Sequence, residues 1–239
     1  MFNYPQIEYF ILDNELRLEY LSSMGIEVWL PRTSVSAISE SGSDWELNDS
    51  DNWDKLNSDI THCHQCDLCH TRTQSLVGSG SHQAEWLWIT EAPSQIEDQD
   101  GDTMLGVTGE LFTEMLRAIN LSKDEVFITH IIKCMTPNNR APHANELINC
   151  HGYIQRQIKL IKPKIMIAVG HVAAQALLNQ HAPLSELKNN THMINNIPLV
   201  VINHPAYLLR FLHEKQSAWL DLLNALQIYK EMKGEPCGD

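Results

Sequence analysis

The chain has 239 residues, of which 43% are hydrophobic and 20% are charged, as in an ordinary globular protein. No apolar run approaches the roughly 18 residues that a membrane-spanning helix needs, and the N-terminal residues lack the pattern of a signal peptide, so we expect a cytoplasmic protein without a membrane contact. The net charge of −13 is unfavourable for gripping DNA phosphates, which takes clustered Lys and Arg.

The first predicted element is a short amphipathic segment at residues 14–32. Leu18, Leu21 and Met24 recur there at helical spacing, and Gly25 offers a helix end. We predict that this part of the chain, up to residue 32, is a separate binding segment.

An acidic linker follows at residues 33–58, which are rich in Ser, Asp, Asn and Glu. Such a composition cannot bury enough apolar surface to fold alone, so we predict disorder. The folded domain is expected at residues 59–233. Residues 234–239 are expected to be a flexible tail in which Cys237 is a free thiol.

Strands and helices alternate along the predicted domain. The expected strands are residues 86–90, 126–132, 165–169 and 199–202, and the expected helices are residues 110–119, 145–161, 172–178 and 215–229. Alternation at this spacing predicts a central parallel sheet with helices on both faces, which is a three-layer α/β/α fold.

Cysteines are the clearest chemical signal in the domain. Cys63 and Cys66 form a C-x-x-C pair, Cys134 ends a predicted strand, and Cys150 lies on the following helix. In a cytoplasmic protein these thiols favour metal binding over disulfides. Four cysteines suit a 4Fe–4S cluster or a zinc ion, and Cys134 and Cys150 are alternatively buried apolar residues. Cys69 forms a second C-x-x-C with Cys66, so spacing does not decide which pair binds.

A series of short motifs runs through the domain in a fixed order. The motifs are Cys63-x-x-Cys66, Thr71-Arg72-Thr73, Glu91-Ala92-Pro93, Glu97-Asp98, Gly106-x-x-Gly109, Ile128-Thr129, Lys133-Cys134, Asn139-Arg140-Ala141-Pro142, Cys150, Pro163-Lys164, Gly170 to Ala176 and His204-Pro205-Ala206-Tyr207-Leu208-Leu209-Arg210. In this order they resemble the family 4 uracil-DNA glycosylases, the iron–sulfur branch of that superfamily, over about 70% of the chain. The resemblance implies a sheet of the uracil-DNA glycosylase type. It also implies a 4Fe–4S cluster held by Cys63, Cys66, Cys134 and Cys150, with Cys69 outside that set.

Four positions depart from the base-binding pocket that the resemblance implies: Thr90, Ser94, Met104 and His130. The family has Gly at the first two, an aromatic ring that stacks on uracil at the third, and an Asn that grips the base edge at the fourth. Met has no flat π-face, and a neutral imidazole carries its donor and acceptor on opposite sides of the ring. We therefore expect a degenerate base pocket.

Two residues keep the identities that the family uses for catalysis. The resemblance implies that Glu91 positions the attacking water and that His204 stabilises charge developing on the uracil. Alternatively, residues 204–210 persist only because they pack against the edge of the sheet.

The N-terminal segment carries a second resemblance. Leu21, Met24, Gly25, Ile26 and Trp29 resemble the Leu-x-x-Leu-Gly-Ile-x-x-Trp core of the N-terminal peptide of the psi subunit of bacterial DNA polymerase III, with Met in place of the second Leu. In that family the peptide docks onto the tau/gamma collar of the clamp loader. A few apolar residues around one Trp suit a short linear anchor. Alternatively, the segment folds back onto the sheet.

Together the two resemblances predict a non-catalytic, psi-type accessory subunit without catalytic residues. It would bind the clamp loader through residues 14–32 and the chi subunit through the folded domain, with weak or indirect DNA contact. The alternative is an active family 4 uracil-DNA glycosylase that uses Glu91 and His204. A third hypothesis is a structural or redox-sensing protein that uses its cluster to report oxidation.

Overall fold

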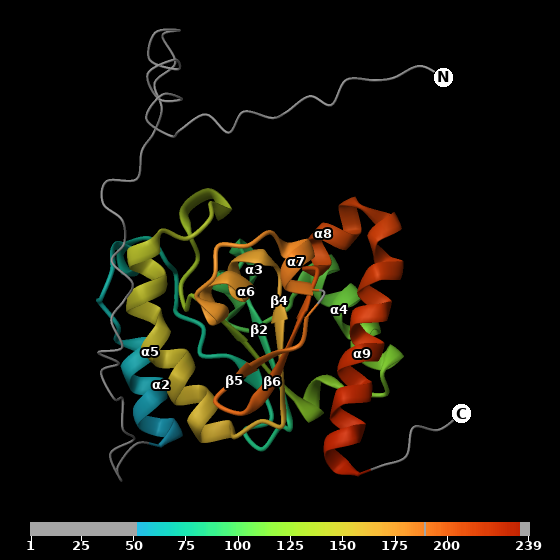
Figure 1. The fold of residues 1–239 in the computed structure, drawn as a ribbon. Coiled ribbons are helices and arrows are strands. Elements are labelled where there is room, and N and C mark those ends of the chain that lie inside the picture. The colour runs from blue at the N-terminus through green and yellow to red at the C-terminus, as the bar shows by residue number, and fades with distance from the viewer. Residues whose placement is uncertain (1–51, 189, 235–239) are drawn as a thin grey trace, which may run out of the picture. The chain divides into compact units, whose positions relative to one another are not determined.

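The computed structural model describes residues 52–188 and 190–234. A six-stranded sheet forms its centre, with the strand order β1-β3-β2-β4-β6-β5 (Figure 1). The strands are β1 (Ser79–Gly80), β2 (Trp86–Thr90), β3 (Val126–His130), β4 (Ile165–Val169), β5 (His192–Ile194) and β6 (Ile197–Ile202). The four inner strands are parallel, and β1 and β5 are antiparallel edge strands.

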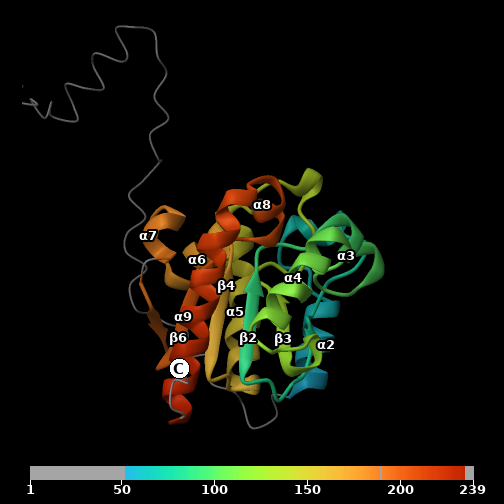
Figure 2. The same cartoon turned by 90° about the vertical axis from the view of Figure 1, so that its right-hand side faces the viewer.

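Helices cover both faces of the sheet (Figures 1 and 2). They are α2 (Trp53–Thr61), α3 (Gln95–Asp100), α4 (Gly106–Ala118), α5 (Ala144–Ile161), α6 (His171–Leu178), α7 (Leu184–Lys188), α8 (Pro205–Arg210) and α9 (Lys215–Lys233). Four short 3₁₀ helices connect them, namely η1 (Asp67–His70), η2 (Lys123–Glu125), η3 (Pro137–Asn139) and η4 (Leu212–Glu214). Within the described residues, no helix is both long and apolar enough to cross a membrane.

Every residue of β2, β3 and β4 is buried, as expected for parallel strands with both faces covered. Successive side chains point to opposite faces, so Leu87 and Ile89 pack with α5, α6 and α7, whereas Trp86 and Trp88 pack with α4, α8 and α9. These two apolar clusters confirm the predicted layered α/β fold.

The structure differs from the sequence predictions mainly at short elements. Residues 53–58, predicted as the end of the linker, form most of α2, because Leu56 and Ile60 bury their side chains against Tyr153 of α5. The edge strands β1 and β5 were not predicted, since two or three residues carry no detectable alternation. Residues 1–32 and the rest of the linker up to residue 51 lie outside the described residues.

The connections of the parallel strands place a binding site at one edge of the sheet. The chain leaves β2 towards β3 on one side and leaves β4 towards β6 on the other. The carboxyl ends of β2 and β4 therefore form the switch point at which open α/β sheets bind ligands.

Candidate functional site

Glu91 directly follows β2 and reaches across the switch point to the start of α6. Its Oε1 accepts a hydrogen bond from the backbone N–H of Val172 at 3.1 Å. A Cβ at Gly170 would collide with the same carboxylate oxygen, and Gly170 has a φ of +97° that favours glycine. The glycine after β4 is thus what allows this carboxylate to lie between the two strands.

His204 follows β6 and caps α8. Its Nδ1 accepts from the backbone N–H of Ala206 at 3.2 Å, and its Nε2 lies 3.1 Å from Oγ1 of Thr90. Because Nδ1 is an acceptor, the proton of the neutral ring is assigned to Nε2, which donates to Thr90. Burial lowers the pKa of His204 and so favours this neutral form.

One buried carboxylate, that of Glu97, connects three of the four departing positions. Its Oε2 accepts from the N–H of Ser94 at 2.7 Å, its Oε1 accepts from the N–H of Met104 at 2.5 Å, and Oε1 also lies 3.5 Å from Nε2 of His130. Burial alone would raise the pKa of Glu97, but His130 and Ser94 outweigh burial and lower it to about 2. Glu97 is therefore ionised at neutral pH.

Sequence reasoning gave Glu97 no role. The available signal was Ser94-x-x-Glu97, a capping-box pattern, and both of its hydrogen bonds are present at the start of α3. The neighbouring Asp98 accepts from the N–H of Thr73 at 2.8 Å, which attaches the segment after the first cysteines to this site.

Ser94, where the family has Gly, adopts a backbone conformation that does not require glycine. Its φ of −76° and ψ of 170° are open to any residue, and its Oγ accepts from the N–H of Glu97 at 3.4 Å. The dihedral angles of the turn therefore accommodate a residue with a side chain at this position.

Met104 lies in the left-handed region with a φ of +52°, which is unusual for a residue with a side chain. Its carbonyl accepts from Nζ of Lys123 at 3.0 Å, and a Cβ at Gly109 would collide with the same carbonyl. The first turn of α4 and Lys123 together hold this loop in place.

Thr90, Met104 and His130 are all nearly fully buried, with exposed fractions of 2%, 3% and 1%. Thr90 and His130 are paired in register at the carboxyl ends of β2 and β3. The structure thus brings together His204 and the four positions that depart from the family, Thr90, Ser94, Met104 and His130. Glu91 is the residue directly after Thr90 at the carboxyl end of β2.

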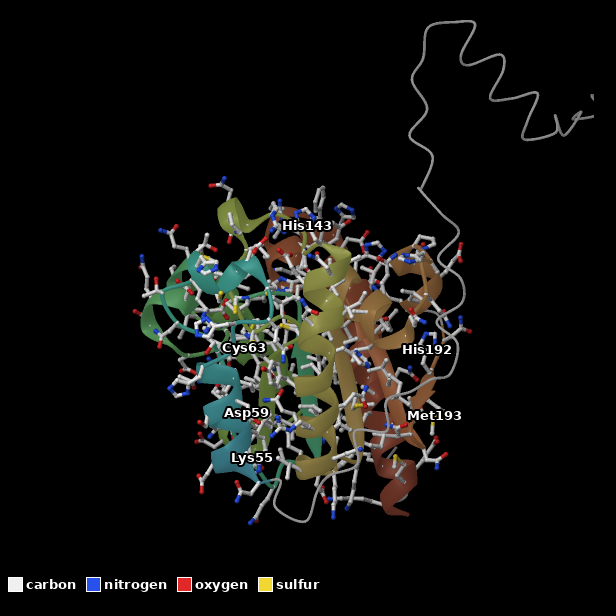
Figure 3. The ribbon with its side chains drawn as sticks, turned by 90° about the vertical axis from the view of Figure 1, so that its left-hand side faces the viewer. Lys55, Asp59, Cys63, His143, His192 and Met193 are labelled. Atoms are coloured by element: carbon white, nitrogen blue, oxygen red, sulfur yellow. The ribbon has the colours of Figure 1, made fainter. Side chains whose placement is uncertain are left out.

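The cysteines form a second site. Cys63 follows α2, Cys66 caps η1, Cys69 lies within η1, Cys134 follows β3 and Cys150 lies on α5. All five line a single pocket, together with Gln65, Arg72, Lys133, Asn149 and Tyr153. Figure 3 shows Cys63 at the end of α2 beside α5.

Two cationic side chains belong to this pocket. Nη1 of Arg72 donates to Sγ of Cys134 at 2.9 Å. Nζ of the buried Lys133 donates to Oγ1 of Thr129 at 2.6 Å, to Oε1 of Gln157 at 2.7 Å and to the carbonyl of His130 at 2.9 Å. Sequence reasoning assigned no role to either cation.

Burial governs the ionisation of this pocket. It raises the pKa of the thiols of Cys66 and Cys134, raises that of Cys150 to about 12, and lowers the pKa of Lys133 to about 7. The thiols are thus protonated when no cation faces them. Among the described residues, no group of three or more His, Cys, Asp or Glu side chains is arranged as a site for a metal ion.

Comparison with known proteins is consistent with the fold and with this arrangement of residues. Residues 77–226, which are more than half of the chain, match the family model of the uracil DNA glycosylase superfamily. A type-4 uracil-DNA glycosylase of Archaeoglobus fulgidus is 34% identical over 164 residues, which cover 65% of this chain and 82% of the relative. Proteins of the same name from Sulfurisphaera tokodaii and Pyrobaculum aerophilum are 36% identical over 131 residues and 32% identical over 164 residues. These matches cover 54% and 65% of this chain and 60% and 84% of the relatives.

These relatives correct the predicted function. Five relatives that are 29–37% identical all bear the name of an enzyme, type-4 uracil-DNA glycosylase, so the prediction of a non-catalytic psi-type subunit is wrong. The segment predicted to bind the clamp loader, residues 14–32, lies outside the described residues. That contact, and the chi contact predicted for the folded domain, stay predictions. Fold, motif order and family match agree, and the chain belongs to the uracil DNA glycosylase superfamily.

Proposed function

We propose that the protein is a uracil-DNA glycosylase that hydrolyses the bond between uracil and deoxyribose in DNA. The observation that carries this proposal is the convergence of Glu91 and a neutral His204 at the carboxyl ends of the parallel strands. The names of the relatives support it. An enzyme of this kind acts on a base that is turned out of the stack into a protein pocket, and the switch point is where such a pocket is expected.

His204 has the chemistry to stabilise the leaving group. When the bond from N1 of uracil to C1′ breaks, its electron pair stays on the base, which leaves as an anion. A fixed N–H donor aimed at that developing charge lowers the barrier. Nε2–H of His204 is such a donor, and in this structure it is held by Thr90.

Glu91 has the chemistry to position the attacking water. The backbone N–H of Val172 orients its carboxylate, which leaves the second oxygen to accept from a water molecule. The water oxygen bonds to C1′, and the water proton passes through the carboxylate to solvent.

The activity is tested with a single-stranded oligonucleotide that contains one uracil, followed by alkali. We expect strand breaks with the wild-type chain and a loss of at least about 100-fold in rate for Glu91→Ala and for His204→Ala. His181→Ala, at an exposed loop position, is the matched control and retains the rate. A wild-type chain with its full iron content that leaves the oligonucleotide uncut would refute the function.

We further propose that Cys63, Cys66, Cys134 and Cys150 hold a 4Fe–4S cluster. The convergence of the cysteines on one pocket supports a cluster at this place, and thiolates are the ligands that such clusters use. The order of the motifs selects these four cysteines over Cys69, which lines the same pocket. Arg72 and Lys133 would offset part of the negative charge of four thiolates, and iron would replace the protons that burial keeps on Cys66, Cys134 and Cys150. When bound, the cluster would link the segment before β1 to α5 and would act as a structural centre.

Iron and acid-labile sulfide measured on anaerobically purified protein test this ligand set. We expect Cys134→Ala and Cys150→Ala to lose the iron and the visible absorbance of the cluster. Cys69→Ala is the matched control and keeps both, although Cys69 lines the same pocket. Full iron content in Cys134→Ala would contradict the proposal.

A further inference from the structure

Lys133 lies between the cysteine pocket and the proposed active site, and it forms hydrogen bonds on both sides. Its backbone N–H donates to the thiol sulfur of Cys150, and its carbonyl accepts from the N–H of Leu76 at 2.8 Å. Its Nζ donates to Oγ1 of Thr129 and to the carbonyl of His130, which are the last two residues of β3. One residue therefore contacts both a proposed cluster ligand and the strand end at the proposed active site.

The surroundings of Nζ are those of an ammonium group. Three oxygens accept from it, namely Oγ1 of Thr129 at 2.6 Å, Oε1 of Gln157 at 2.7 Å and the carbonyl of His130 at 2.9 Å. An ammonium has three N–H donors and no lone pair, which matches three acceptors. All three acceptors are neutral, and no carboxylate contacts Nζ in the described part of the chain.

A buried ammonium with only neutral partners needs a negative charge nearby. Lys133 is 1% exposed, and a buried charge without a counter-charge is strongly unfavourable. The groups whose negative charge would stabilise it are Cys150 and Cys134, which line the same pocket as Lys133. As thiolates of the proposed cluster, these two cysteines would supply the counter-charge.

The same side chain ties the end of β3 to its neighbours. Gln157 of α5, which accepts from Nζ of Lys133, donates through its Nε2 to the carbonyl of Val77 at 2.6 Å, just ahead of β1. Two residues after β3, the N–H of Ile132 donates to the carbonyl of Glu91 at 3.3 Å. The segment that Lys133 holds is therefore bonded to the backbone of a proposed catalytic residue.

We propose that Lys133 is a positioning residue that connects the cysteine pocket to the proposed active site. Its ammonium is the counter-charge of the cluster, and it holds the carboxyl end of β3 at the position where His130 faces Glu97. This inference rests on the proposed function and its cluster, and it adds the residue through which one site supports the other. Lys133 itself touches neither the substrate nor the reacting atoms.

Two variants of the full, iron-loaded chain separate the charge of Lys133 from its hydrogen bonds. Lys133→Met removes the charge and the donors at similar length, whereas Lys133→Gln removes the charge and keeps two N–H donors. Lys188→Met is the matched control, because Lys188 is also largely buried but pairs with Asp221 at 2.8 Å, between α7 and α9.

Spectroelectrochemistry measures the midpoint potential of the cluster, and a role in packing alone would leave it unchanged. A cation beside the cluster favours its reduced form, so both Lys133 variants should shift the potential to more negative values. Lys188→Met should keep the wild-type potential.

Hydrogen exchange and steady-state kinetics measure the effect on β3. We expect Lys133→Met to raise the exchange rate of residues 126–132 about tenfold and Lys133→Gln to raise it less, because charged hydrogen bonds are lost. Uracil release by Lys133→Met should show a kcat about tenfold lower with KM little changed, since a displaced site slows chemistry more than binding. Lys188→Met should keep the wild-type exchange in this segment.

A wild-type potential in both loaded Lys133 variants would overturn the inference, as would a loaded Lys133→Met with wild-type exchange at residues 126–132. If neither Lys133 variant binds iron while Lys188→Met does, the counter-charge role is supported. Equal loss of iron from all three would overturn it. A wild-type chain that binds the cluster but releases no uracil would refute only the glycosylase, because potential and exchange are measured without substrate. A wild-type chain without iron would refute the cluster and this inference with it.

Discussion

At the scale of single residues, Glu97 connects more parts of the site than its place in a capping-box motif suggests. It ties the turn after β2, the loop of Met104 and the end of β3 to one carboxylate. From its residue type alone, Glu97 would be expected to be an exposed, solvated side chain. Only the folded chain shows that 6% of it is accessible and that two backbone N–H groups converge on it.

The ionisation of Glu97 gives a pH-dependent stability. Its pKa is about 2 in the folded chain and 4.5 in the unfolded chain, so its contribution is present above pH 4.5 and is lost as the pH falls towards 2. This corresponds to about 2 kcal/mol of unfolding free energy between pH 5 and pH 3. Urea unfolding at both pH values should show a loss about 2 kcal/mol smaller in Glu97→Gln. If the wild-type chain and Glu97→Gln lose the same unfolding free energy between pH 5 and pH 3, the pKa of Glu97 is not lowered by these contacts.

Motifs in the sequence identify the four cysteines proposed as cluster ligands and the proposed catalytic residues Glu91 and His204, but they do not give the geometry of the site. The prediction of a non-catalytic subunit is contradicted by the relatives named type-4 uracil-DNA glycosylase, whereas the degenerate base pocket stays a prediction. Residue type alone did not show that Ser94 has an ordinary φ and caps α3. The contact between Glu97 and His130 joins residues 33 positions apart and has no local signature.

At the scale of elements, the start of α5 determines where Cys150 lies. Glu146 accepts two hydrogen bonds from Arg140, at 2.6 and 2.9 Å, and one from the N–H of His143 at 2.7 Å. His143 is labelled at this end of α5 in Figure 3. Glu146 and Cys150 are four residues apart and so share one face of the helix. Fixing the first turn therefore directs the thiol into the cysteine pocket.

Removing this cap is expected to affect both stability and metal content. Glu146→Ala should lower the unfolding free energy by about 1–3 kcal/mol, because charged hydrogen bonds are lost from a buried carboxylate, and should also reduce the iron content. Urea unfolding and an iron assay measure the two effects. Glu125→Ala, in the exposed capping box of η2, is the matched control and keeps the iron. If both variants keep it equally, α5 does not need its cap to present Cys150.

The long elements were predicted because each has a continuous apolar run or a helical period. Helix α5 was expected at residues 145–161 and is found at Ala144–Ile161. Helices α3 and α8 were missed, because six residues hardly exceed one turn and leave too few positions to show a helical period. These two short helices adjoin the site, so the parts that shape the pocket are the parts that periodicity does not detect.

At the scale of the whole molecule, acidic charge limits how the proposed glycosylase could hold DNA. Several described cations are paired with carboxylates, as Lys188 is with Asp221 and Lys164 and Lys233 are with Glu85. Arg210, exposed at the end of α8, forms no ion pair with a carboxylate in the described part of the chain. Figure 1 shows α8 at the same end of the sheet as α3, α6 and α7. Under the proposed function, we therefore expect Arg210 to contact a DNA phosphate near the site.

Salt dependence of binding tests this placement. The uracil and cytosine probes are single-stranded oligonucleotides with one 2′-fluoro-deoxyuridine or one 2′-fluoro-deoxycytidine, in which the fluorine prevents cleavage. Arg210→Ala should weaken binding to both probes equally and reduce the slope of log Kd against log salt concentration by about one. Arg117→Ala, which removes an exposed cation paired with Glu114, is the matched control and leaves the slope unchanged. A loss confined to the uracil probe would instead assign Arg210 to the base.

The contact between Gly109 and the Met104 carbonyl limits how this pocket can change during evolution or design. Backbone meets backbone there, so any larger residue at 109 would displace the loop rather than reshape it. The loop that carries Met104 is therefore fixed in position relative to α4. In the proposed base pocket, change at this point is open to the side chain of residue 104 and closed to its backbone.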